Sequence, residues 1–214
     1  MAQDRKQALT QFHRQTIIDA AGRLFLKTGV SGTTMEDIAK ESGYSKSTVY
    51  VYFSSKTEIN NALACHAMAL LNERIIEAIA SREGFHEQFE AISAALLIYQ
   101  RDHPYYFQRL TDTIDYSVDP QEKTPWLYEA FVVGEELNTT VRDFVRRGMD
   151  LKLLREEPSL VKTQMVFWFA ISGLMQVSAN KKTYIADSLT ISQEEFLEYG
   201  LRVMLRAFEE SGAS

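Results

Sequence analysis

Side chains suited to binding a polyanion are concentrated in residues 46–56. Lysine supplies a positive charge, serine and threonine hydroxyls donate or accept hydrogen bonds, and tyrosine does so from a flat ring. The residues concerned are Lys46, Ser47, Thr48, Tyr50, Tyr52 and Lys56. Groups of these kinds contact the phosphates and base edges of nucleic acids. The segment therefore predicts a surface that lies against DNA, although small three-helix units also serve as plain packing units.

Two short helices are predicted to position this segment. The first of these is expected to begin at Thr33 or Thr34, where Thr33 and Glu36 have the spacing of a capping box, and Gly43 ends it. Ser45 caps the second helix, which follows after a tight turn. If Val49 points inward, the polar residues of the second helix lie on its outer face. This arrangement is typical of a helix-turn-helix unit.

A third helix is expected to begin directly after the polar segment. Ser55 and Glu58 have capping-box spacing, and Lys56 lies in the first turn. A positive charge at that end opposes the helix dipole. An external anion bound there would explain the lysine.

The residues from 34 to 39 and from 43 to 56 resemble the DNA-binding head of TetR-family transcriptional regulators. The turn, the aromatic pair and the lysine fall at the spacing of the family. Two positions depart from the pattern, because Ser47 stands where the family often has glycine and Tyr52 where it often has histidine. The departures leave the operator sequence unpredictable.

The resemblance implies a role for each matching residue. Thr34 contacts a phosphate, Lys46 faces the major groove, and Lys56 grips the DNA backbone. Lys46 is the expected base contact, to guanine O6 and N7. The implied DNA-binding residues are Thr34, Ser45, Lys46, Ser47, Thr48, Tyr50, Tyr52 and Lys56.

Composition and charge place the chain among helical cytoplasmic proteins. Of 214 residues, 45% are apolar and 24% are charged, which excludes disorder. Residues 1–60 carry eight Lys and Arg against six Asp and Glu, whereas the remainder carries fifteen against twenty-three.

One cysteine, Cys65, forms no internal disulfide, and the polar start lacks the apolar core of a secretory signal. The long uncharged stretch 163–180 contains several polar residues and is interpreted as a buried helix rather than a membrane span.

The whole chain is predicted to be all-α, with two domains. Residues 1–55 are the helix-turn-helix DNA-binding domain, and residues 56–214 are a larger helical bundle for effector binding and dimerisation. A helix from about Ile17 to Gly29 is expected before the helix-turn-helix unit, and the helix from Lys56 ends at a break over residues 81–84. The later helices are expected over residues 85–102, 104–115, 126–148, 158–180 and 192–210.

The last two helices are predicted to form a homodimer. Between Met165 and Met175, apolar side chains surround nearly the whole helix, more than packing on its own core requires. The final helix has a capping box, Ser192 with Glu195, and a stripe that includes Gly200. A symmetric dimer through these helices is also what the resemblance implies. A large intramolecular core is the alternative.

Aromatic residues of the body indicate a binding site for a small apolar or aromatic effector. Ten of the 24 aromatic residues fall between Phe85 and Phe131, and bundle interiors lined in this way hold apolar ligands. The expected ligand contacts are Tyr106, Trp126, Tyr128, Phe131, Phe167 and Trp168. No cofactor or metal site is expected.

The resulting hypothesis is a TetR-like repressor that a small effector releases from double-stranded operator DNA. The alternatives are a helical-bundle adaptor for a protein partner, an activator without small-molecule control, and an enzyme. A di-iron enzyme needs two Glu-x-x-His motifs, and only Glu83 with His86 fits. We therefore expect no catalytic residues.

Overall fold

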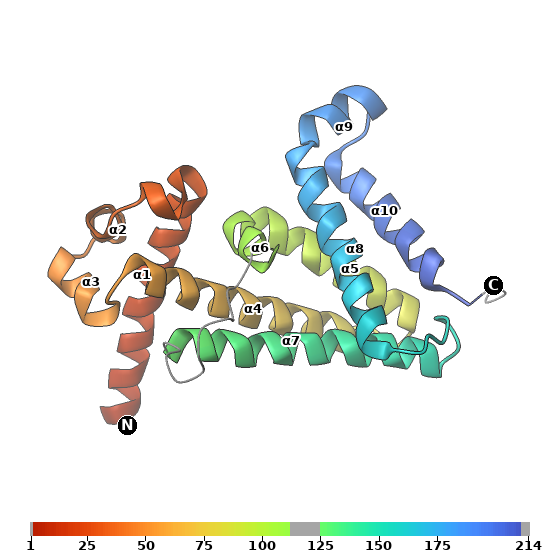
Figure 1. Ribbon diagram of the computed structural model, residues 1–214, viewed down its shortest axis with the longest axis horizontal. Coiled ribbons are helices and arrows are strands. Elements are labelled where there is room, and N and C mark those ends of the chain that lie inside the picture. The colour runs from red at the N-terminus through yellow and green to blue at the C-terminus, as the bar shows by residue number, and fades with distance from the viewer. Residues whose placement is uncertain (1, 112–124, 211–214) are drawn as a thin grey trace. The chain divides into compact units, whose positions relative to one another are not determined.

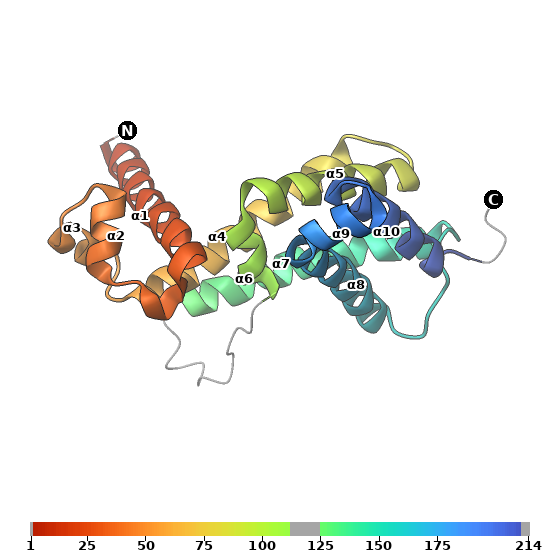
Figure 2. The same cartoon turned by 90° about the horizontal axis from the view of Figure 1, so that it is seen from above.

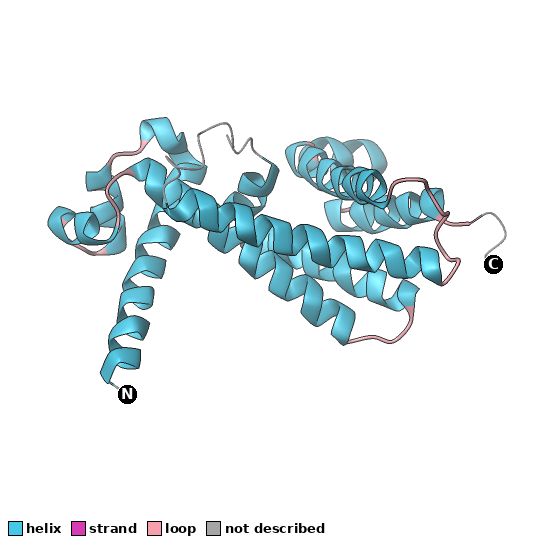
Figure 3. Cartoon of the chain, turned by 60° about the horizontal axis from the view of Figure 1, so that its bottom comes forward, coloured by secondary structure: helices cyan, strands magenta, loops and turns pink. Residues whose placement is uncertain are grey.

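The computed structural model describes residues 2–111 and 125–210, and within these ranges every regular element is an α-helix (Figures 1 and 3). The helices are α1 (Ala2–Gly32), α2 (Met35–Ser42), α3 (Lys46–Tyr52), α4 (Lys56–Ala80), α5 (Phe85–Asp102), α6 (Pro104–Thr111), α7 (Pro125–Asp150), α8 (Leu160–Asn180), α9 (Lys182–Leu189) and α10 (Gln193–Phe208). The predicted all-α fold is confirmed. The expected end of α6, residues 112–115, lies outside the described residues.

The helices form two compact units. The first contains residues 1–69 and 103–134, and the second contains residues 70–102 and 135–214. Helices α4 and α7 therefore each contribute to both units. The domain boundary at residue 55 stays a prediction, but the first unit joins α6 and the start of α7 to the predicted DNA-binding domain.

In the first unit, α1 packs on α2 and α6, and α2 packs on α3 (Figure 2). The core of this helix group is fully buried at Ile17, Ile38, Val49 and Phe53. Helical periodicity places these side chains on the inner faces, as the apolar spacing predicts. Gly29, with a φ of 73°, interrupts α1, since glycine adopts a left-handed φ without steric cost.

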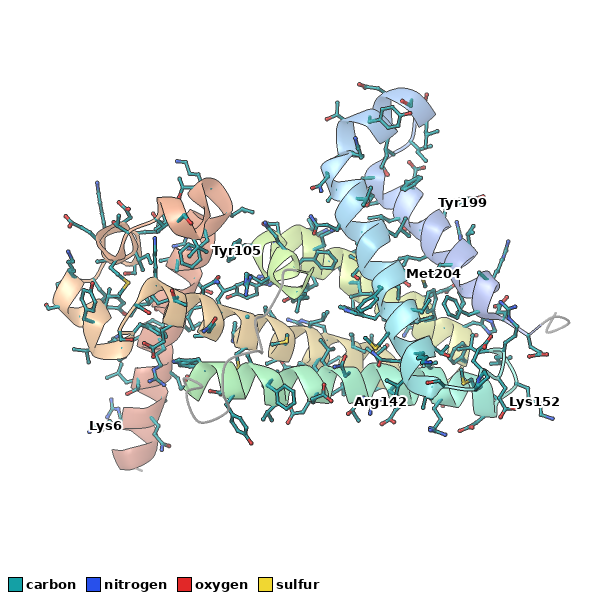
Figure 4. The ribbon with its side chains drawn as sticks, in the orientation of Figure 1. Lys6, Tyr105, Arg142, Lys152, Tyr199 and Met204 are labelled. Carbon is teal, nitrogen blue, oxygen red and sulfur yellow. The ribbon has the colours of Figure 1, made fainter. Side chains whose placement is uncertain are left out.

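Helix α1 begins well before the expected start at Ile17 and includes the polar residues from Ala2 onward. Lys6 lies on this amino-terminal part (Figure 4). Apolar periodicity does not reveal it, because Leu9 and Phe12 are 57% and 64% exposed and therefore belong to no buried face. A helix without a buried face carries no apolar stripe in its sequence.

The capping box of α2 is shifted by one residue from the prediction. Thr34, not Thr33, is the N-cap, and Asp37, not Glu36, completes the box. Thr33 is buried, and its hydroxyl donates to the carbonyl of Gly29 at 2.8 Å. Its side chain is therefore committed to the end of α1.

In the second unit, α8, α9 and α10 pack on one another and α10 packs on α5 (Figure 2). Ser159 caps α8, and the predicted capping box of Ser192 and Glu195 is present at α10. Helix α9 was not predicted, because eight residues with one buried side chain, Ile185, show too little periodicity.

Candidate nucleic-acid interface

Three hydroxyls cluster at the amino end of α3. The Oγ of Ser45 accepts a hydrogen bond from the backbone N–H of Thr48 at 3.1 Å. It also lies 2.9 Å from the Oγ of Ser47 and 2.7 Å from the Oγ1 of Thr48. The cap fixes the first turn of α3, and the positive end of the helix dipole faces the same region. Hydroxyls placed at such an end suit a phosphate oxygen.

The outer face of α3 presents both charge and apolar surface. The Nζ of Lys46 lies 3.6 Å from Oε2 of Glu36, and both side chains are mostly exposed. Tyr50 is 48% exposed, and Val51 is 78% exposed. Val51 is not among the predicted DNA contacts, because that prediction depends on polar side chains alone. An exposed branched apolar side chain on such a face suits the methyl group of thymine.

The ring of Tyr52 packs against α1. Its centroid lies 5.6 Å from that of the His13 ring. The Nδ1 of His13 forms a hydrogen bond of 2.6 Å with the hydroxyl of Tyr44, which lies in the turn between α2 and α3. His13 was not predicted as part of the site, since its place beside the turn depends on the unexpected early start of α1.

Thr34 and Asp37 form reciprocal hydrogen bonds at the start of α2. The hydroxyl of Thr34 donates to Oδ2 of Asp37 at 2.6 Å, and the backbone N–H of Thr34 donates to the same atom at 2.9 Å. These hydrogen bonds, that of the Thr34 hydroxyl first, lower the pKa of Asp37. Thr34 remains exposed, so its backbone position is fixed while its surface stays accessible.

Lys56 is hydrogen-bonded within the chain. Its Nζ donates to the carbonyl oxygens of Ser31 at 3.2 Å and of Thr33 at 2.9 Å. These carbonyls lie at and just beyond the carboxyl end of α1, where a positive charge is favourable. The position of Lys56 in the first turn of α4 therefore has an internal explanation, and an external anion is not required to account for it.

The predicted capping box at α4 is only half formed. The Oγ of Ser55 accepts from the backbone N–H of Glu58 at 3.2 Å, as expected. The carboxylate of Glu58, however, accepts from the N–H and the hydroxyl of Ser54, each at 2.6 Å, rather than from Ser55. The carboxylate thus binds the first residue after the cap of α3.

The family sequence model described as "Bacterial regulatory proteins, tetR family" matches residues 17–63. This range holds the second half of α1, all of α2 and α3, and the start of α4. Over residues 17–63 the chain is similar to the tetR family. Apart from His13, the interface residues described above lie within the matched segment.

Curated relatives match a part of the chain, whereas solved structures match most of it. The regulator TtgR of Pseudomonas putida is 44% identical over 50 residues, which are 23% of this chain and 24% of TtgR. The chain spans about half the length, or less, of the curated relatives it matches. The fold is shared more widely than the sequence. The structure of FadR from Bacillus subtilis in complex with stearoyl-CoA matches 89% of this chain and 97% of its own, with a TM-score of 0.67 and 15% identity.

A second solved structure is that of SmeT, the repressor of the Stenotrophomonas maltophilia multidrug efflux pump SmeDEF. It covers 93% of this chain and 91% of its own, with a TM-score of 0.62 and 18% identity. At this identity the likeness shows the fold alone. The fold shared with these structures therefore extends beyond the matched amino-terminal residues.

The second unit of the chain contains an apolar cavity of about 20 Å³. It is lined from α4, α5, α7 and α8 by Ile75, Phe89, Ile92, Leu96, Val141, Phe144, Phe167, Trp168 and Ile171. Phe167 and Trp168, two of the predicted effector contacts, lie on its wall. A wider groove of about 290 Å³ lies between α5 and α10 and is lined by both apolar and charged side chains.

The other predicted effector contacts do not line this cavity. The hydroxyl of Tyr106 donates to Asp19 at 2.8 Å, and Trp126 donates to Glu58 at 3.1 Å, so both contact the helices of the first unit. Tyr128 and Phe131 are 60% and 43% exposed on α7. Among the described residues, no group of three or more His, Cys, Asp and Glu side chains is placed to hold a metal ion.

Proposed function

We propose that the chain is a cytoplasmic DNA-binding transcriptional regulator that represses by occupying an operator and leaves it when a small apolar or aromatic effector binds. The observation that carries this proposal is the outer face of α3, which combines exposed Lys46, Tyr50 and Val51 with a capped, hydroxyl-rich first turn. Repression by SmeT, a protein of the same fold, supports the sign of regulation.

Each exposed group of α3 has a matching group on duplex DNA. The Lys46 ammonium donates to guanine O6 and N7, and Val51 packs on a thymine methyl group. Ser47, Thr48 and Tyr50 donate to phosphates, with Ser45 holding the first turn and Tyr52 anchored on His13. Thr34 and Lys56 flank the helix, and in this proposal Thr34 contacts a phosphate while Lys56 fixes the loop that carries it.

The partner of the second unit is proposed to be a second copy of the chain, bound through α8 and α10. One side of α8 exposes Val166, Phe169 and Val177, and α10 exposes Tyr199 and Val203. Tyr199 and Met204 mark α10 in Figure 4. By length and composition α8 is able to cross a membrane. One third of its most apolar 18-residue stretch is buried within the chain. Its exposed apolar residues lie on one side only, which suits a partner helix rather than lipid on all sides.

A dimer has a direct use for DNA recognition. Two copies of α3 related by a two-fold axis reach half-sites about 34 Å apart, one turn of the duplex. A change in the separation of the two recognition helices therefore weakens binding to both half-sites together.

The effector site is proposed to be the apolar cavity beside Phe167 and Trp168. Its volume of about 20 Å³ is below that of a small organic molecule, so an effector must displace side chains from the wall. Every lining residue is apolar, which favours an apolar or aromatic ligand without a buried charge. The complex of FadR with stearoyl-CoA shows that a protein of this fold takes a ligand with a long apolar chain.

The experiment that tests the proposal is selection of duplexes from a random-sequence library by the full-length chain. We expect one preferred sequence with two-fold symmetry, and a log affinity that falls linearly with log salt concentration. Lys46→Ala is expected to change the preferred sequence, whereas Tyr50→Ala weakens binding to all duplexes alike.

The salt dependence of binding also distinguishes the proposed regulator from a helical adaptor for a protein partner, since protein binding through an apolar face depends little on salt. The activator alternative needs a separate test, in which transcription from a promoter that contains the selected site is followed with and without the chain. Increased transcription would contradict repression while leaving DNA binding intact.

A further inference from the structure

Trp126 lies in the first turn of α7 and contacts the end of α3. Its ring centroid lies 6.0 Å from that of Phe53, at an interplanar angle of 34°. Phe53 is the C-cap residue of α3 and is 1% exposed. The last turn of the recognition helix therefore rests on a residue that comes far later in the sequence.

A carboxylate connects Trp126 to the residue that follows this cap. The indole N–H donates to Oε1 of Glu58 at 3.1 Å. The other oxygen of Glu58 accepts from the backbone N–H and the hydroxyl of Ser54, each at 2.6 Å. Both oxygens are thus occupied, one by α7 and one by the chain as it leaves α3.

The indole ring is also in contact with α1. The guanidinium carbon of Arg14 lies 5.2 Å from the centroid of the Trp126 ring, within the range of a cation–π interaction. The Nε of Arg14 is buried and has no hydrogen-bond partner among the described residues, so contact with the ring is a main interaction of this guanidinium. Trp126 therefore touches three separate elements: α1, the cap of α3 and the start of α4.

We propose that Trp126 is a positioning residue for DNA binding, which fixes the carboxyl end of the recognition helix without touching DNA. The inference rests on the proposed function and adds a determinant that lies outside the residues 17–63 matched by the family model. Tyr50 and Val51 lie within one turn of the Phe53 cap, so a shift of this end moves the exposed side chains that face the duplex.

The contacts also separate this role from binding of an effector. The indole N–H donates to Glu58, the guanidinium of Arg14 lies over the ring, and the ring of Phe53 lies beside it at an angle of 34°. A hydrogen bond to a carboxylate is strong and directional, and a charge accepting three hydrogen bonds holds its partners in one geometry. These partners belong to the DNA-binding helices of the same unit, so the contacts of Trp126 stabilise the arrangement of those helices.

The test compares affinities for the duplex that the wild-type chain selects from a random-sequence library. Trp126→Phe keeps a ring and removes the N–H, Glu58→Gln removes the charge, and Trp126→Ala removes the ring as well. Each of the first two is expected to weaken binding on the order of tenfold. Their combination is expected to cost less than the product of the two effects, because both disturb the Trp126–Glu58 hydrogen bond, while Glu58→Gln also weakens the bonds from Ser54. Glu129→Gln, an exposed carboxylate in the same part of α7, is the control and leaves affinity unchanged.

A spectroscopic signal distinguishes positioning from a general loss of stability. The chain has two tryptophans, so 5-fluorotryptophan labelling gives two ¹⁹F resonances, and the one absent from Trp126→Phe belongs to Trp126. We expect this resonance to shift when the selected duplex is added. Thermal unfolding of each variant is followed in parallel, and if Trp126→Ala does not fold, the other two variants still decide the question.

Two failures are distinguishable. If the wild-type chain selects no duplex, the proposed function is wrong. If it binds a selected duplex while folded Trp126→Phe and Glu58→Gln bind equally well, and the Trp126 resonance does not move, the proposed function stands and the positioning role is wrong.

Discussion

The hydroxyl of Tyr106 on α6 donates a hydrogen bond to Oδ1 of Asp19 on α1 at 2.8 Å. Gln15 donates to the same oxygen at 2.8 Å, so the carboxylate of Asp19 holds two partners. The rings of His66 and His103 pack on Tyr106 at centroid distances of 5.6 and 5.2 Å. Burial, and then the hydrogen bond to Asp19, raise the pKa of Tyr106. Helix α6 is thereby fixed to the first helix of the DNA-binding group.

Tyr106→Phe is expected to lower the free energy of unfolding by about 1.5 kcal/mol, because a hydrogen bond to a charged acceptor is lost and Asp19 keeps one partner. Urea titration followed by circular dichroism measures the change. Tyr105→Phe is the matched control: it removes a bond of 3.0 Å to the neutral amide oxygen of Asn60 and is expected to cost less. If the two variants lost the same free energy of unfolding, the charge of Asp19 would not strengthen the hydrogen bond from Tyr106.

Acid is expected to weaken the capping box of α2. The pKa of Asp37 is lowered in the folded chain, first by the hydroxyl of Thr34 and then by its backbone N–H. Between the folded and the unfolded pKa of Asp37, the unfolded chain binds the proton more readily than the folded chain. The contribution of the capping box to the free energy of unfolding is therefore complete above the ordinary carboxyl pKa of about 4, and it is lost as pH falls through the lower folded value.

Asp37→Asn is therefore expected to flatten the acid side of the stability profile. Urea midpoints measured from neutral pH to about pH 3 check this, since that range spans the titration of an ordinary aspartate. Glu73→Gln, an exposed carboxylate on α4, is the control. A profile for Asp37→Asn with the same acid slope as the wild type would show that the box does not contribute.

Lys46→Ala and Lys56→Ala are expected to separate base recognition from loop positioning. The Lys46 side chain is exposed, so its loss changes which duplex is preferred at little cost in stability. Lys56 donates to two carbonyl oxygens, so its loss lowers the free energy of unfolding by about 1 kcal/mol and weakens binding to all sequences alike. Duplex selection and thermal unfolding of both variants decide between these patterns.

Phe169→Glu is expected to produce monomers. The ring is 60% exposed on α8, and a buried charge at a two-fold interface meets its own copy. Sedimentation velocity measures the oligomeric state, and affinity for the selected duplex is expected to fall at least tenfold because one half-site is then bound alone. Ile76→Glu on α4, at a residue 50% exposed, is the control and stays dimeric.

The fold was largely predictable because its signals are local. Gly29 and Gly43 both have the left-handed φ that glycine supplies at a helix end, and Ser45 and Ser192 both cap helices as their sequence context indicates. The shift of the α2 cap from Thr33 to Thr34 was not predictable from spacing, since both threonines have an acidic residue three positions later. The choice depends on the tertiary contact between Thr33 and Gly29.

The site was predictable only where its residues are consecutive. Residues 45–56 form one short segment, so their types and order indicated a surface. His13 and Trp126 reach the same helices from distant parts of the chain. Their roles depend on packing that no short-range pattern encodes. The sequence does not show whether a given aromatic residue of a helical body binds a ligand or makes a structural contact. For Trp126 the distances to Glu58, Phe53 and Arg14 favour the structural contact.

The most direct test of the account is titration of the full-length chain with its selected duplex over a range of salt concentrations. We predict two chains bound per symmetric duplex and a log affinity that falls steeply and linearly with log salt, as phosphate contacts by two copies of α3 require. Absence of a preferred duplex, or an affinity that does not change with salt, would contradict the claim that the outer face of α3 binds DNA.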